Sequence, residues 1–116
     1  MDLKTLIEKG AIVAQTPATV EVSWTHLDDK GQEVNDTFAV RIKRHSAGTI
    51  EEMWHGHGNG KKRSFQATLI AESILLGDGD EKFTYKQAYD LDPSLAQELV
   101  EVIDKVNPVR KREKKA

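Results

Sequence analysis

Residues 69–107 read LIAESILLGDGDEKFTYKQAYDLDPSLAQELVEVIDKVN, and this stretch decides the fold because most of it follows helical periodicity. Its first part continues a helix that Ser64 can cap and whose apolar face runs up to Gly77. The apolar face consists of Phe65, Leu69, Ile70, Ile74 and Leu76. The spacing therefore predicts a central helix over residues 64–76, and no strand is expected there or in residues 94–106.

Two further helices are expected after the acidic turn GDGDE. Thr84 and Gln87 stand at the spacing of a capping box, which predicts a short helix directly after Thr84. Asp92 can cap the last helix, with Pro93 at its first position. An amphipathic stripe follows at helical spacing and consists of Leu95, Leu99, Val102, Ile103 and Val106. The last helix should stop at Asn107-Pro108, since a proline cannot continue a helix.

Upstream of this stretch, two runs of alternating apolar and polar residues flank the turn-rich segment HLDDKGQE, residues 26–33. Alternation with a period of two residues is typical of strands with one buried face. The pattern predicts an antiparallel β-hairpin over residues 19–43. Its core-facing side would carry Val20, Val22, Trp24, Phe38, Val40 and Ile42.

Two shorter helices are expected on either side of the hairpin. Residues 2–9 have leucines and isoleucine at helical spacing, and Gly10 stands where a C-terminal cap belongs, so this segment is predicted to be a helical lid or mobile arm. After the hairpin, Thr49 and Glu52 match a capping box. The helix that they predict carries Ile50, Met53 and Trp54.

The expected fold class is therefore α+β, with an N-terminal short helix and an antiparallel β-hairpin packed against three to four α-helices. A chain of 116 residues is typical of one domain, which we place at residues 1–108. Residues 109–116 read VRKREKKA and have one large apolar side chain among many charges. Such a segment cannot bury a core, so a disordered basic tail is expected.

Composition excludes several functional classes. Seventeen basic and nineteen acidic residues leave a net charge of -2, which provides no overall basic field for nucleic acid. The chain has no cysteine, so disulfides, cysteine-based zinc sites and thiol nucleophiles are excluded. The N-terminus has no apolar stretch of signal-peptide length, and no run approaches the roughly 20 residues of a membrane span. We expect a cytoplasmic protein that is neither secreted nor inserted into a membrane.

No motif in the sequence supports catalysis. His55 and His57 could share a metal ion, but a zinc site needs three or four ligands. A third could come from His26, His45, Asp78 or Asp80 only through a tertiary arrangement, and a polar loop that happens to contain two histidines is the preferred interpretation. The loop GHGNGKK (56–62) lacks the spacing of a Walker A motif, and the acidic turn that begins at Asp78 lacks the ligand and glycine positions of an EF-hand. The sequence therefore predicts no enzyme, no cofactor and no metal site.

Several segments together resemble the tail assembly chaperones of long-tailed phages and prophages. The similarity is carried by MDLKTLIEKGAIV, FAVRIKR, GTIEEMW, ATLIAESILLGDGDE and YKQAYDLDPSLAQELVEVIDKVNPV, which together span most of residues 1–109. The loop HGHGNGKK (55–62) is richer in glycine and histidine than the pattern typical of this family. The resemblance implies a small protein of the host cell cytoplasm that coats the tape measure protein and keeps it soluble until tail tube subunits polymerise around it.

The resemblance also implies protein partners. These are the tape measure protein and, as further candidates, the tail tube protein and other copies of this chain, whereas membranes and nucleic acids are not expected. Apolar helix surface would make the contact, because a long helical client exposes apolar stripes. The candidate protein-binding residues are Leu3, Leu6, Ile7, Trp54, Leu99 and Val106.

Two expectations concern the basic tail. The competing functional class is a small nucleic-acid-binding or regulatory module that uses RKREKK (110–115) to contact phosphates. Within the resembled family, a longer product is often made by ribosomal frameshifting near the end of the short reading frame. Glu113-Lys114-Lys115 can be encoded by a run of repeated nucleotides, so the same event is an expectation for this chain.

Overall fold

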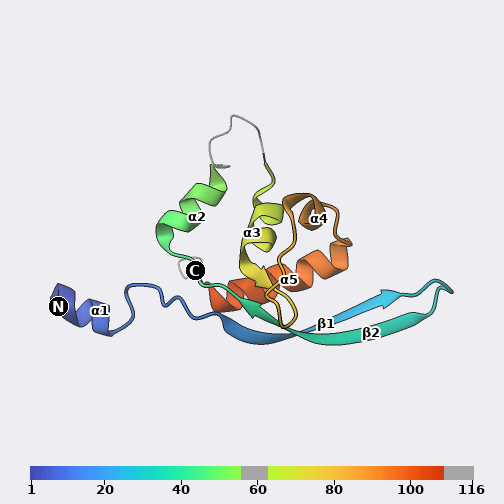
Figure 1. The fold of residues 1–116 in the computed structure, drawn as a ribbon, viewed down its shortest axis with the longest axis horizontal. Coiled ribbons are helices and arrows are strands. Elements are labelled where there is room, and N and C mark those ends of the chain that lie inside the picture. Colours follow the sequence, from blue (N-terminus) through green and yellow to red (C-terminus); the bar gives the residue numbers. More distant parts are fainter. Residues whose placement is uncertain (56–62, 109–116) are drawn as a thin grey trace, which may run out of the picture.

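The computed structural model describes residues 1–55 and 63–108 (Figure 1). The loop 56–62 and the tail 109–116, including the predicted disorder of that tail, lie outside the described residues. Along the chain the described elements are α1 (Leu3–Glu8), β1 (Ala18–Leu27), β2 (Glu33–Ile42), α2 (Ala47–Trp54), α3 (Phe65–Ser73), β3 (Ile74–Leu75), α4 (Tyr85–Tyr89) and α5 (Pro93–Val106). The architecture is α+β, as predicted.

The hairpin forms where the alternating pattern predicted it. Strands β1 and β2 pair antiparallel, with Val20 opposite Val40 and Val22 opposite Phe38. The predicted inner face is confirmed, since Val22, Val40 and Ile42 are buried. The remaining members of that face are half-buried, namely Val20, Trp24 and Phe38.

The central helix ends at Ser73, three residues before the predicted end. Ile74 and Leu75 form β3, which pairs antiparallel with β2 and extends the sheet to the order β1-β2-β3. The prediction that residues 64–76 contain no strand is therefore wrong. Helical periodicity suggested that Ile74 would be buried, and it is fully buried, but from an extended backbone. Strand β3 forms because the free edge of β2 offers its backbone hydrogen-bonding groups. The local sequence pattern cannot reveal such a distant partner.

The turn after β3 closes on itself. Leu76 and Glu81 exchange two backbone hydrogen bonds of 2.8 Å each. Gly77 has a φ of +66° and Asp80 a φ of +55°, and the Asp80 carboxylate forms an ion pair with Arg41 of β2. The segment that superficially resembles a calcium loop is thus a tight turn tied to the sheet.

Helix α2 begins earlier than predicted. Its N-cap is Ser46, whose hydroxyl accepts a hydrogen bond from the Thr49 backbone N–H at 3.2 Å, so the capping box expected at Thr49 and Glu52 is wrong. Thr49 instead lies in the first turn, because the serine three residues before it already satisfies its N–H.

The other helix starts agree with the sequence. Ser64 caps α3 by accepting a hydrogen bond from the Ala67 N–H at 3.1 Å. Thr84 and Gln87 form the predicted capping box of α4. Asp92 caps α5 with Pro93 in the first turn, and the helix ends before Asn107 as expected.

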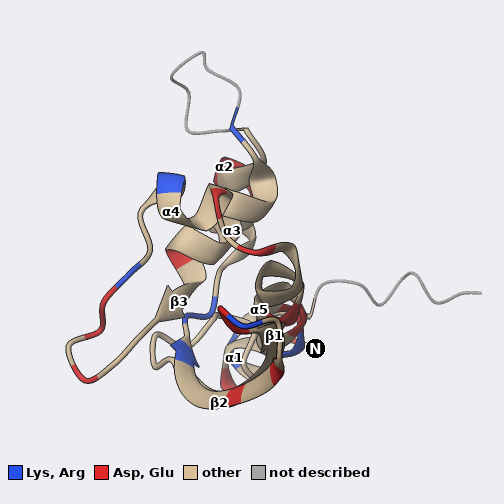
Figure 2. Ribbon diagram, turned by 90° about the vertical axis from the view of Figure 1, so that its right-hand side faces the viewer, with Lys and Arg blue, Asp and Glu red and all other residues tan. Residues whose placement is uncertain are grey.

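The buried apolar side chains form a core between the sheet and the helices. Helix α5 packs on β1 and on α3, while α4 packs on α3. In Figure 1, α1 stands apart from the helices α3, α4 and α5, and the hairpin turn points away from it at the far side. Figure 2 shows acidic and basic residues distributed over many elements. Within residues 1–55 and 63–108, no helix is long and apolar enough to cross a membrane.

Candidate functional site

The histidines of the described segments are not arranged as a metal centre. In residues 1–55 and 63–108, no group of three or more histidine, cysteine, aspartate or glutamate residues could hold a metal ion. His55 follows α2 as its C-cap, whereas His57 lies outside the described residues. His26 stacks on Trp24 at 3.7 Å between ring centroids and contacts Asp36 at 2.7 Å. Two other surface features carry exposed apolar or aromatic side chains.

The first such feature is the N-terminal arm, residues 1–9, which contains α1. The carboxylate of Asp2 caps the helix by accepting a hydrogen bond from the Thr5 N–H at 2.9 Å. Hydrogen bonding by the side chain and then by the backbone of Thr5 lowers the pKa of Asp2 below its usual value. No residue of α1 is buried. Leu3 is 71% exposed, and Leu6 and Ile7 are also exposed. The arm therefore presents apolar side chains to solvent.

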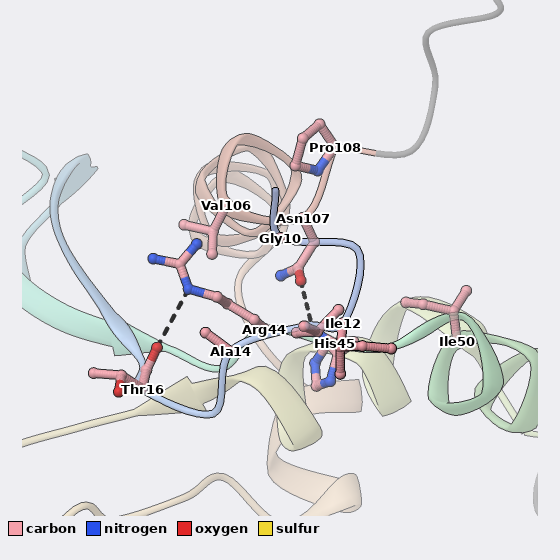
Figure 3. A pocket seen from close by; sticks show the side chains of 11 residues that line it. Gly10, Ile12, Ala14, Thr16, Arg44, His45, Ile50, Val106, Asn107 and Pro108 are labelled. Carbon is pink, nitrogen blue, oxygen red and sulfur yellow. Dashed lines mark hydrogen bonds between the residues drawn. The ribbon is translucent and has the colours of Figure 1, made fainter. Parts of the chain in front are cut away.

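A hollow of about 420 Å³ lies directly where the arm joins the body (Figure 3), and we call it the arm groove. Three segments that are distant in sequence surround it: residues 10–16, residues 44–50 and the end of α5. Its apolar walls are Ile12, Val13, Ala14, Ile50 and Val106. Arg44, His45, Thr16 and Asn107 add polar groups. The arm is thus joined to the groove through Gly10, which is part of the groove lining.

Asn107 holds two of these segments together. Its side-chain oxygen accepts a hydrogen bond from the His45 backbone N–H at 2.8 Å, and its amide donates to the Lys43 carbonyl at 3.1 Å. A further bond to the carbonyl of Ile103 at 3.3 Å ties the side chain to its own helix. Asn107, the C-cap of α5, therefore joins this helix by hydrogen bonds to the segment that follows β2.

Arg44 and His45 set the electrostatics of the groove. Arg44 Nε donates a hydrogen bond to the Thr16 carbonyl at 3.3 Å, and Figure 3 shows its guanidinium between Thr16 and Val106. His45 Nε2 lies 2.7 Å from the buried hydroxyl of Ser73, and burial lowers the pKa of His45 below its ordinary value. His45 is therefore neutral near pH 7, which leaves Arg44 as the charged side chain among the described residues that line the groove.

A second group of side chains gathers around the start of α3. Trp54 stacks on Phe65 at 4.1 Å with an angle of 7° between the ring planes, yet Trp54 remains 66% exposed. Arg63 lies over the ring of Tyr85 at 4.2 Å, and Tyr85 packs near Tyr89. The apolar spacing of α2 favours a core position for Trp54, so its exposure differs from that expectation. Its role as an anchor for a partner stays a prediction.

Apart from Trp54, the structure separates the predicted binding residues into three groups. Leu3, Leu6 and Ile7 lie on the exposed arm, and Val106 lies in the wall of the arm groove. Leu99 is fully buried in the core, so a partner cannot reach it in this conformation. Leu99 belongs to the amphipathic stripe of α5, and this helix packs on β1 and α3.

Sequence reasoning did not identify Ile12, Arg44 or Ile50 as groove residues. One signal was present, since Ile12 and Val13 are apolar residues in an irregular segment between Gly10 and Pro17, where no core-forming pattern explains them. Arg44 and Ile50 had no comparable signal. Their contribution depends on which segments the fold brings together.

Comparison with known proteins gives one match. A family model described as phage tail assembly chaperone, TAC, matches residues 4–107. The matched range includes most of the arm and every wall of the arm groove except Pro108. No curated protein and no solved structure matches the chain.

Proposed function

Because this chain belongs to the phage tail assembly chaperone family, we propose that it binds the tape measure protein and keeps that protein soluble until tail tube subunits assemble around it. The chain would act before the tail is complete, by covering apolar surface of its client. No chemical step is required for this role. Contacts with the tail tube protein and with other copies of the chain belong to the same proposal.

The observation that carries the proposal is the exposed arm. Helix α1 has six residues and buries none of them, although isolated helices shorter than about 12–15 residues are marginal in water. Exposed apolar side chains that adjoin a hollow are typical of protein-binding surfaces. The arm would gain its missing apolar contacts from a client.

The arm groove suits an amphipathic helix as client. Recognition of this kind places a few apolar side chains of the helix, spaced three or four residues apart, into an apolar hollow. The groove supplies aliphatic walls from different segments, and the arm with its exposed apolar side chains precedes it directly in the chain. A tape measure protein is a long helical chain, so many such segments could be covered in succession.

The alternative function, a nucleic-acid-binding or regulatory module, depends on residues 109–116. These residues lie outside the described part of the chain. The arm and the arm groove favour the chaperone role, since both present aliphatic side chains that a protein client could cover.

Co-expression with the tape measure protein tests the proposal. The wild-type chain should move most of the client from the insoluble to the soluble fraction, and the double variant Leu3→Asp/Ile7→Asp should lose that effect. Leu27→Asp is a matched control, because Leu27 is 67% exposed at the other end of the hairpin, where no contact is proposed. Client solubility that is the same with and without the wild-type chain would overturn the proposal.

A further inference from the structure

The charges around the arm groove are unbalanced. No aspartate or glutamate is among the described residues that line it, and Arg44 is its permanent cation. The ion pairs formed within the described segments do not include Arg44. Lys43 lies outside the lining, and the nearby His45 is neutral at pH 7 because its burial disfavours the charged form. Among the described residues that line the groove, Arg44 thus provides the one charged side chain at pH 7.

The position of Arg44 leaves most of its hydrogen-bonding capacity available. Its Nε group donates to the carbonyl of Thr16, which holds the side chain at the mouth of the groove. A guanidinium has five N–H donors, and its terminal amino groups can bind a carboxylate in a bidentate arrangement. The bond to Thr16 therefore orients the side chain without occupying those amino groups.

The walls exclude a simple anion as the natural occupant. Ile12, Ile50 and Val106 surround the space next to Arg44, and a hydrated ion such as phosphate would gain nothing from covering these side chains. The hollow of about 420 Å³ is within the size range of ligand pockets, roughly 300–1,000 Å³. Its occupant should combine aliphatic surface with one negative charge.

We propose that the arm groove binds a partner segment in which an aliphatic side chain lies beside an aspartate or glutamate, and that Arg44 selects this segment by pairing with the carboxylate. The inference rests on the proposed function, because it specifies the chemistry of the client at the same surface. A helical client meets the requirement when the two side chains stand three or four positions apart, since such residues are neighbours on one face. Arg44 is thus a specificity residue, and the apolar walls provide the general affinity.

Labelled amphipathic peptides of about 18 residues provide the probe, because shorter isolated helices are marginal in water. Three peptides share one leucine stripe and differ at a single flanking position, which is glutamate, glutamine or lysine. The wild-type chain should bind the glutamate peptide about two- to five-fold more tightly than the glutamine peptide, as expected for a partly exposed ion pair, and the lysine peptide most weakly. Added salt should reduce this preference.

Charge reversal at the arginine makes the test specific. Arg44→Glu should reverse the order and favour the lysine peptide, while Arg44→Gln should remove the discrimination. Lys30→Glu makes the same change in net charge at the exposed hairpin turn, so it should keep the wild-type order. Circular dichroism should show that all variants fold. Methyl resonances of Ile12, Ile50 and Val106 should shift with the glutamate peptide.

The outcomes separate the inference from the proposed function. If the peptides do not bind, or if Arg44→Glu keeps the wild-type order, the inference is overturned. If the wild-type chain still solubilises the tape measure protein in that case, the proposed function stands and only the role of Arg44 is wrong. A reversed order together with shifted groove methyls supports the inference, whereas the proposed function is supported only by solubilisation of the tape measure protein.

Discussion

Asn107 shows how one side chain can join elements that are distant in sequence. It satisfies the N–H of His45 and donates to the Lys43 carbonyl, and it is half-buried. Asn107→Ala would leave these partly buried backbone groups without partners. We expect a loss of about 1–3 kcal/mol in the free energy of unfolding, measured by urea denaturation. Asn35→Ala, which removes bonds on an exposed strand face, should cost less, and an equal loss would contradict the role of Asn107.

The two histidines with shifted pKa values should affect stability in opposite directions. The hydrogen bond to Asp36 raises the pKa of His26 above its usual 6.5, so the folded state binds a proton more tightly than the unfolded chain does. The stabilisation of the folded state by protonated His26 is fully present below pH 6.5 and is lost as pH rises through the raised pKa. Burial lowers the pKa of His45, so the unfolded chain takes up this proton more readily than the folded state does. His45 therefore lowers the stability of the fold as pH falls below 6.5.

A substitution at His26 tests the predicted direction in which its contribution to stability changes with pH. His26→Gln should destabilise the fold more near about pH 5.5 than near about pH 8, because only protonated His26 makes the charge-assisted bond to Asp36. Urea denaturation of both proteins at each pH gives the measurement. A loss that is larger at the higher pH would show that the bond depends on neutral histidine.

At the level of single residues, the sequence predicts what depends on near neighbours. The caps at Ser64, Thr84 and Asp92 could be recognised because each acts on an N–H two or three residues away. Arg44 and His45 could not be recognised, since their partners Thr16 and Ser73 are each 28 residues distant. The arm groove exists only after such distant contacts have formed.

Among the elements, α1 differs from the other helices because it contributes no buried residue. Deletion of residues 1–9 should therefore change the free energy of unfolding by less than about 0.5 kcal/mol, as measured by urea denaturation. Ile70→Ala in α3 is the contrasting control, and it should cost about 2–5 kcal/mol because Ile70 is fully buried. A large loss on deletion would show that the arm packs on the body in solution.

Helix α3 and strand β3 show why a local pattern can fail at an element boundary. Ile74 would be buried either as part of a helix or as part of a strand, so the apolar spacing alone could not decide between these two structures. The decision comes from β2, which pairs Ile42 with Ile74, and from the Lys43 N–H, which donates to the Ser73 carbonyl at 2.9 Å. Long amphipathic helices such as α5 have no such competition and are predicted well.

For the whole molecule, the buried apolar residues of the sheet, α2, α3, α4 and α5 belong to one core cluster. We expect residues 1–108 to unfold in one cooperative transition, with equal calorimetric and van't Hoff enthalpies. A chelator such as EDTA should leave the transition temperature unchanged, because we predict no bound metal that stabilises the fold. Two separate transitions, or a fall of several degrees with EDTA, would contradict these expectations.

The bonds of Asn107 also determine when the surface becomes complete during synthesis. They join Asn107 to His45 and Lys43, which lie 62 and 64 residues earlier in the sequence, and the arm precedes both of these residues. A ribosome adds roughly 5–20 residues per second, so the last wall of the groove follows the arm by several seconds or more. A nascent chain therefore displays its apolar arm before the groove can close beside it. Any partner that it meets in this interval meets the arm alone, and capture by the full surface waits for residue 107 to leave the ribosome.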